Sequence, residues 1–231
     1  MTFEINVPDE TKVLIISDLH LTQHFDQKKY DLLYKLVSEC DQLVINGDLW
    51  TYYSCVVDSF LGSRWAELFP LFREKNCLYI LGNHDRARWT GNKLNSLCLW
   101  KGNKAVLRFN KVTLKIEHGH KISKLDSTHN EAFVWADRFF KVDIVGDYLQ
   151  KALIDLLGVE YYCGLGKKLN KIQKRRVGGN SEGKEYLVVG HTHSPEIDHE
   201  VGYINSGFIH YGYASYITVQ NSHVTLHKTS Y

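Results

Sequence analysis

Side chains that can bind divalent metal ions fall in five short groups along the chain. The groups are Asp18 with His20, Asp48, Asn83 with His84 and Asp85, His118 with His120, and His191 with His193. Carboxylate, imidazole and amide groups are ligands for manganese, iron, cobalt, nickel or zinc, and the lack of a thiolate disfavours a structural zinc site. The set is larger than one ion needs. It therefore indicates two ions, which can clamp the attacking and leaving oxygens of a phosphoryl transfer.

Apolar runs precede four of these groups and predict the strands that position them. The runs lie at residues 13–16, 42–46, 77–81 and 186–189, and helical patterns lie at residues 28–39 and around 56–72. Short apolar runs bounded by glycine and polar residues are typical of buried strands, so the series predicts an α/β core. Ligands bind at the carboxyl edge of such a sheet. Residues two apart in an extended segment point the same way, so Asp18 and His20 can face one ion together.

The pattern changes after residue 104. Residues 105–109 and 112–116 alternate around Asn110 and Lys111, which predicts a hairpin. Residues 203–204, 214–219 and 223–227 are also strand-like. We expect these strands to form a second, more antiparallel sheet that packs on the first.

A helical insertion is predicted at residues 121–184, within a single domain that covers residues 1–231. Residues 130–157 are rich in large apolar side chains and predict one or two helices broken near Gly146. A basic stretch from Lys167 to Arg176 follows, and then the flexible sequence at 178–180. Residues 130–176 form either packed core or a lid over the site. The basic stretch is either a solvated helix face or a site for a second phosphate or a nucleic-acid backbone.

The bulk composition is that of an ordinary globular protein, with 44% hydrophobic and 23% charged residues. A net charge of +2 gives no reason to expect a polyanion bound over the whole surface. The five cysteines include no CxxC pair, the first residues lack the apolar core of a signal peptide, and no run reaches a membrane span of ~18 residues. We therefore expect a cytoplasmic protein without a transmembrane segment. Peripheral membrane contact and oligomeric state stay open.

The five groups, in this order and at strand ends, resemble the calcineurin-like metallophosphoesterase superfamily over residues 13–193. The resemblance implies a four-layer αββα sandwich. It also implies that Asp18, His20 and His193 bind one metal, that Asn83, His118 and His191 bind the other, and that Asp48 bridges both. His120 stays outside this metal set. The expected cofactor is two divalent ions, with manganese first and iron, zinc, cobalt or nickel as alternatives.

The resemblance also implies a reaction, in which a hydroxide activated by the two metals attacks phosphorus. His84 would stand beside the substrate phosphate and protonate the leaving group or stabilise the developing charge, and Asp85 would orient His84. Arg86 and Arg88 follow this block directly. We expect them to bind substrate, because arginine suits bidentate phosphate contacts.

The layout is most similar to the branch that contains the UDP-2,3-diacylglucosamine pyrophosphatases, in which inserted helices cap the site. The chain departs from the bacterial lipid enzyme at His84, where that enzyme usually has arginine. The predicted function is hydrolysis of a phosphoester or pyrophosphate bond in a phosphorylated small molecule, a nucleotide-linked lipid or a sugar. Nucleic acid or a small nucleotide is the alternative substrate. A non-catalytic scaffold of the same fold is the alternative from another class, and the complete ligand set disfavours it.

Overall fold

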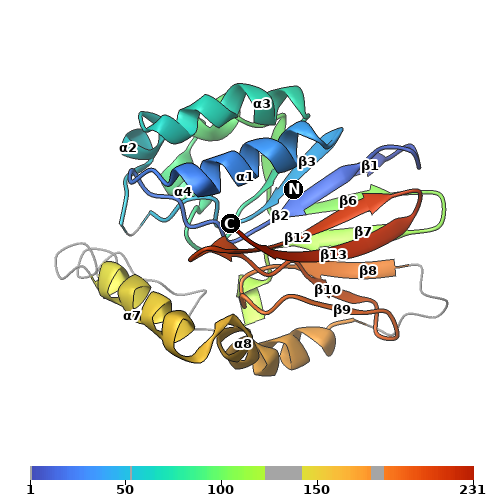
Figure 1. Ribbon diagram of the computed structural model, residues 1–231. Helices are drawn as coiled ribbons and strands as arrows, with labels where there is room; N and C mark the ends of the chain where they lie inside the picture. Colours follow the sequence, from blue (N-terminus) through green and yellow to red (C-terminus); the bar gives the residue numbers. More distant parts are fainter. Residues whose placement is uncertain (1, 53, 123–141, 178–184) are drawn as a thin grey trace.

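Two β-sheets lie face to face at the centre of the computed structural model, which describes residues 2–52, 54–122, 142–177 and 185–231 (Figure 1). Within those residues the first sheet has seven strands and the second has six. The first sheet contains β2 (Val13–Ile16), β3 (Gln42–Asn46), β4 (Leu78–Ile80), β5 (Trp100–Gly102), β11 (Ile209–His210), β12 (Tyr213–Gln220) and β13 (His223–Ser230). The second contains β1 (Thr2–Asn6), β6 (Lys104–Arg108), β7 (Thr113–Glu117), β8 (Glu185–Val189), β9 (Glu196–Asp198) and β10 (Tyr203–Asn205).

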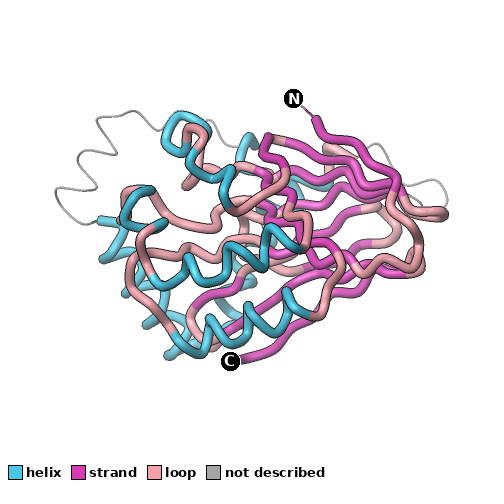
Figure 2. The backbone as a smooth tube through the Cα atoms, turned by 90° about the horizontal axis from the view of Figure 1, so that it is seen from above, coloured by secondary structure: helices cyan, strands magenta, loops and turns pink. Residues whose placement is uncertain are grey.

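The first sheet has a parallel centre, as the alternating strands and helices predicted. Strands β2, β3, β4 and β5 pair in parallel and in sequence order. The connections carry α1 (Gln27–Ser38), α2 (Val57–Leu61), the 3-10 turn η1 (Arg64–Leu68), α3 (Phe69–Glu74), α4 (Ala87–Thr90) and the 3-10 turn η2 (Lys93–Ser96). In the view from above, the strands extend beyond these helices at one end (Figure 2).

The C-terminal strands do not lie where the sequence placed them. The predicted hairpin of β6 and β7 is present, and both strands are in the second sheet together with β8. However, β12 pairs with β2 in the first sheet, where Ile217 lies opposite Ile15, and β13 pairs with β12. Alternation along a strand shows which residues share a face, but it does not show which strand is the neighbour. Of the strands that follow β8, only β9 and β10 join the second sheet.

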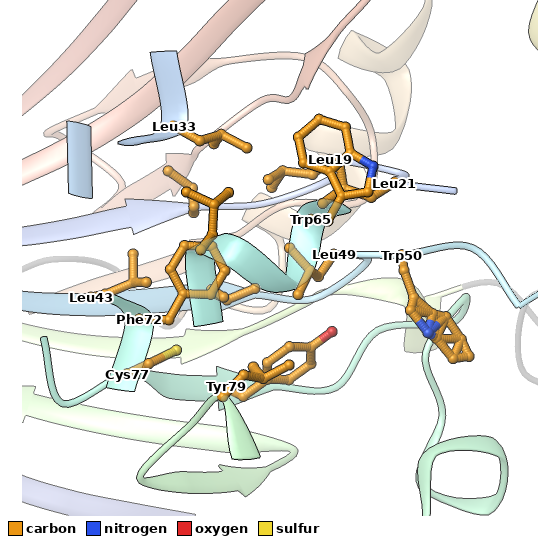
Figure 3. Packing of buried hydrophobic residues seen from close by; sticks show 14 of the residues in the cluster. Leu19, Leu21, Leu33, Leu43, Leu49, Trp50, Trp65, Phe72, Cys77 and Tyr79 are labelled. Atoms are coloured by element: carbon orange, nitrogen blue, oxygen red, sulfur yellow. The ribbon is translucent and has the colours of Figure 1, made fainter. Parts of the chain in front are cut away.

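Side chains that alternate along β2 fill two separate cores. Leu14 and Ile16 pack under the helices, in the cluster of Figure 3 that also contains Leu33 and Phe72. Val13 and Ile15 point the other way and pack between the two sheets. Both faces of this strand are buried, which explains why the sequence shows a continuous apolar run instead of alternation.

The outer face of the second sheet is covered by α8 (Val159–Lys174), which follows α7 (Val142–Leu157) (Figure 1). The buried Asn170 and Gln173 of α8 contact Tyr203 of β10. Helices, first sheet, second sheet and α8 are therefore stacked in the αββα order that the sequence predicted, which confirms the mixed α/β fold.

The predicted helix break at Gly146 is wrong. Helix α7 runs through Gly146, where an added side chain would meet open space. The chain instead turns at Gly158, whose φ of +84° suits glycine and separates α7 from α8. The apolar residues 130–141 and the glycines at 178–179 lie outside the described residues. In the part of the chain that is described, no helix has the length and apolar character needed to cross a bilayer.

Candidate metal centre and active site

The five ligand groups meet at the carboxyl ends of strands from both sheets. Asp18 follows β2, Asp48 follows β3, Asn83 follows β4, His118 follows β7 and His191 follows β8. The parallel pairing of β2, β3 and β4, and of β7 and β8, brings their ends to the same edge. Loops that follow parallel strands of one sheet lie at the same edge, which brings these side chains together.

The backbone of the ligand loops is strained and not extended. Asp18, His20 and Asp48 have φ of +54°, +46° and +54°, and His191 and His193 have +67° and +52°. Non-glycine residues rarely adopt this left-handed conformation, and such residues cluster at functional sites. The expectation that Asp18 and His20 converge along an extended segment is therefore wrong in its geometry, although both side chains reach the same point.

Asp18, His20 and His193 form the first group of side chains that could hold an ion. The Nε2 atoms of the two histidines lie 3.2 Å apart. Nε2 of His193 lies 3.4 Å from Oδ1 of Asp18, and Nε2 of His20 lies 4.0 Å from it. Burial and then the neighbouring His84 lower the pKa of His20 well below its usual value, so its ring is neutral and can offer a lone pair. These three side chains can hold one cation.

The second ligand group lies beside the first and contains Asp48, Asn83, His118 and His191. Nε2 of His118 is 3.1 Å from Oδ2 of Asp48 and 3.2 Å from Oδ1 of Asn83. The same amide oxygen is 3.1 Å from Nδ1 of His191. Asp48 also forms a group with His20 and His84, so its carboxylate stands between the two clusters.

The donor set fits cations better than it fits hydrogen bonding alone. Asp18 and Asp48 are buried, and Oδ1 of Asp18 has no hydrogen-bond partner. A buried carboxylate oxygen without a partner is costly unless a cation compensates its charge. Burial opposes the charged form of His118, but the carboxylates of Asp48 and Asp18 raise its pKa to about 10. The two carboxylates thus favour positive charge at this position.

Backbone groups hold the ligands in position. The amide of His191 donates to Oδ2 of Asp18 at 2.9 Å, and the amide of His84 donates to Oδ1 of Asp48 at 2.9 Å. Nδ1 of His118 lies 2.8 Å from the carbonyl oxygen of Asn46, which directs Nε2 toward the cluster. Such outer contacts fix the ring orientation of metal-binding histidines.

His84 lies beside the cluster, as expected for a residue next to the substrate. Its ring meets the ring of His20 edge-on at 4.7 Å, and its Nδ1 lies 2.8 Å from Oγ1 of Thr51. Asp85 does not have the expected orienting role. Its carboxylate accepts hydrogen bonds from the hydroxyl of Tyr79 at 2.6 Å and from the amides of Leu49 and Gly82 at 3.0 and 2.5 Å.

The two arginines that follow Asp85 lie in different surroundings. Nε of Arg86 donates to the carbonyl oxygen of Asn83 at 3.3 Å, and its side chain lines a pocket with His120 and Lys121. Arg88 is exposed, and its guanidinium lies 4.8 Å from the centre of the Trp89 ring. Arg86 therefore lies against the backbone of Asn83, and Arg88 lies at the surface.

Sequence reasoning missed Thr51, which contacts His84, and Tyr162, which contacts the proposed ligand His193. The hydroxyl of Tyr162 lies 2.8 Å from Nδ1 of His193. The ring of His210 also lies near the site, 6.3 Å from the ring of His20. None of the three belongs to a recognisable motif, so the printed sequence carried no signal for them.

Residues 11–195 match the model of the calcineurin-like phosphoesterase family. The chain belongs to this family. A calcineurin-like phosphoesterase hydrolyses phosphate esters with divalent metals, in agreement with the ligand groups described above. A search of curated proteins found no match.

Solved structures of other proteins align with this calcineurin-like phosphoesterase along nearly its whole length. YfcE, a phosphoesterase from E. coli, is 17% identical, with 95% of this chain and 98% of that chain covered and a TM-score of 0.47. A predicted phosphoesterase from Streptococcus pneumoniae TIGR4 is 13% identical, with 95% of this chain and 98% of that chain covered and a TM-score of 0.39. Nuclease MPE from Pseudomonas putida is 13% identical, with 93% and 87% covered and a TM-score of 0.40.

Proposed function

We propose that this calcineurin-like phosphoesterase holds two divalent cations, with Asp48 as the bridging ligand. The first cation is held by Asp18, His20 and His193, and the second by Asn83, His118 and His191. The observation that carries the proposal is the position of the Asp48 carboxylate, which groups with histidines of both clusters. The unpartnered Oδ1 of Asp18 supports it. Nitrogen and oxygen donors without thiolate suit manganese, and iron, cobalt, nickel and zinc fit the same donors.

When bound, the two cations would supply Lewis acidity and lower the pKa of a water molecule. The side chains of the protein supply the remaining functions. His84, held by Thr51, is proposed to protonate the leaving oxygen or to stabilise charge on the phosphate. Arg86 is proposed to bind a phosphate oxygen from the pocket that it shares with Lys121. Arg88 is proposed to bind substrate, and Asp85 is proposed to support catalysis by holding the loops after β3 and β4.

We propose a phosphorylated small molecule as substrate, with an apolar or sugar portion attached through a phosphoester or pyrophosphate bond. A nucleotide-linked lipid or sugar has this character. Helices α7 and α8 support the proposal because they reach the site through Tyr162 and expose large apolar side chains. The exposed side chains include Tyr148, Leu149, Leu156, Tyr161 and Leu165.

A nucleic-acid substrate is less well supported, because neighbouring acids neutralise part of the basic stretch. Lys174 pairs with Glu196 and Asp198, and Arg176 pairs with Glu117. The five cysteines are buried thiols, which supports the proposal that the protein works in a reducing cytoplasm.

Metal content and turnover of bis(p-nitrophenyl) phosphate test the function. We expect metal-stripped protein to bind two manganese ions and to gain activity on reloading. Asp48→Asn should bind at most one ion and lose roughly a hundredfold or more in turnover, because a bridging carboxylate serves both ions. Asp58→Asn is the matched control, since Asp58 is exposed and pairs with Lys93. Wild-type turnover in Asp48→Asn would contradict the proposal. Comparison of UDP-sugars, cyclic nucleotides and single-stranded DNA then ranks the substrate classes.

A further inference from the structure

Helix α8 contributes a side chain that touches a proposed metal ligand from behind. The hydroxyl of Tyr162 lies 2.8 Å from Nδ1 of His193 and donates to Oε1 of Gln150, on α7, at 2.6 Å. The Tyr162 ring packs edge-on against the buried Phe208 at 5.5 Å, and Phe208 stacks on the ring of His193 at 5.2 Å. These contacts fix both the hydroxyl and the imidazole.

The direction of the hydrogen bond between Tyr162 and His193 determines which ring nitrogen of His193 keeps a lone pair for a metal ion. A phenol has one proton to donate, and the phenol of Tyr162 donates it to Gln150. The contact with His193 is therefore a hydrogen bond from Nδ1–H of the ring to the phenol oxygen. Nε2 then carries the lone pair, and Nε2 is the atom that faces His20 at 3.2 Å and Asp18 at 3.4 Å.

A histidine of the second cluster has the same arrangement, in which Nδ1 faces a hydrogen-bond acceptor, but the acceptor is different. There the carbonyl oxygen of Asn46 lies 2.8 Å from Nδ1 of His118, and Nε2 of His118 faces Asp48. A backbone carbonyl can only accept, so it needs no help to select the tautomer. A phenol can donate or accept, so Tyr162 needs Gln150 to take its proton.

We propose that Tyr162, held by Gln150, is a positioning residue that fixes the tautomer of His193 and thereby the cation bound by Asp18, His20 and His193. The proposal rests on the proposed function of this site as a metal centre. It makes α7 and α8 part of the metal centre itself, in addition to any part that they have in substrate binding.

Tyr162→Phe tests the proposal, because it keeps the ring that packs on Phe208 and removes only the hydroxyl. The first measurement is zinc affinity by competition with a chelator. We expect one of the two ions to bind about tenfold to a hundredfold more weakly and the other to change less than twofold. Tyr161→Phe is the matched control on the same helix, because the Tyr161 side chain is 53% exposed and Tyr161 is not among the proposed ligands or their contacts.

The second measurement reads the tautomer directly in metal-free protein, by long-range proton–nitrogen correlation of labelled histidines. Wild-type His193 should show the proton on Nδ1. In Gln150→Ala the phenol can donate to the ring instead, so the proton should move in part to Nε2. This variant leaves Tyr162 in place and keeps the test usable if Tyr162→Phe folds poorly.

The outcomes separate the two proposals. Wild-type protein that binds neither ion would overturn the proposed metal function. Wild-type protein that binds two ions, with unchanged affinities in Tyr162→Phe and an unchanged tautomer in Gln150→Ala, would overturn the role of Tyr162 alone. Equal weakening of both ions would also overturn it, because the contact is with a ligand of one cluster.

Discussion

Oγ1 of Thr51 lies 2.8 Å from Nδ1 of His84, and this contact joins the loop after β3 to the loop after β4. Thr51 is almost completely buried, with 4% of its surface exposed. The backbone makes a second link, because the amide of Tyr52 donates to the carbonyl oxygen of His84 at 3.1 Å. The ring of His84 is therefore held from behind by a residue that belongs to a different strand–loop unit.

Thr51→Val should lower kcat about tenfold and leave KM within about twofold, because it removes the hydroxyl while the side chain keeps its shape. His84→Ala should lower kcat more, by roughly a hundredfold or more, as expected for loss of an acid or charge-stabilising group. Steady-state kinetics with bis(p-nitrophenyl) phosphate provide the measurement. Thr51→Ser keeps the hydroxyl and should retain most of the activity. Equal kinetics in Thr51→Val and wild type would show that the contact does not position His84.

Tyr79→Phe should destabilise the protein by about 1–3 kcal/mol, because the buried carboxylate of Asp85 would lose one of its donors. Burial, and then the nearby Asp48, already raise the pKa of Asp85 to about 7. Urea unfolding at pH 8, where more of the carboxyl is charged, gives the free energy of unfolding. Tyr34→Phe is a suitable control because Tyr34 is 52% exposed. Identical unfolding curves for Tyr79→Phe and the wild type would show that this hydrogen bond makes no net contribution to the free energy of unfolding.

The positions of the ligand loops could be predicted from sequence because they depend on local signals. Asp18 and Asp48 each follow a short apolar run, and parallel strands of one sheet end at the same edge. The conformation of those loops could not be predicted. Asp18 and Asp48 have positive φ in loops that make tertiary contacts, such as the amide of His191 with the Asp18 carboxylate.

Side-chain contacts between distant segments could not be predicted from a single sequence. Nothing in the residues around Tyr162 indicates that its hydroxyl meets a histidine 31 positions later. The helix break shows the same limit. Both Gly146 and Gly158 occur in the predicted helical region, and only the backbone shows that Gly158 has positive φ. Glycine is permitted in both settings, so its presence does not distinguish them.

Gly82→Ala should abolish tight binding of at least one metal ion. A Cβ atom at residue 82 would lie 2.0 Å from Oδ1 of Asp48, so the proposed bridging carboxylate would have to move. Metal content after dialysis at limiting manganese gives the readout. Gly164→Ala is the matched control in the interior of α8, where a Cβ atom would meet nothing within 4 Å. It should keep both ions and raise the free energy of unfolding by about 0.5–1 kcal/mol. Full metal content in Gly82→Ala would contradict the packing argument.

Lys29 should make the stability of the protein depend on pH above neutrality. Its side chain is buried, and Nζ donates to the carbonyl oxygen of Leu19 at 2.5 Å. Burial lowers the pKa of Lys29 from 10.5 to about 7, against the attraction of Asp26 and Asp147. Between these two values the unfolded chain binds more protons than the folded one. The free energy of unfolding therefore rises with pH in this window, by up to about 1.4 kcal/mol per unit.

Lys29→Met removes the titrating group and provides the comparison, because every other titration is common to both proteins. The free energy of unfolding of the wild type, minus that of the variant, should increase steadily from pH 7 to pH 9. Below pH 7 the lysine is charged in both folded and unfolded states, so the difference should become flat. Urea unfolding of both proteins across pH 6 to 9 measures it. Parallel curves over the whole range would mean that Lys29 keeps an ordinary pKa in the folded protein.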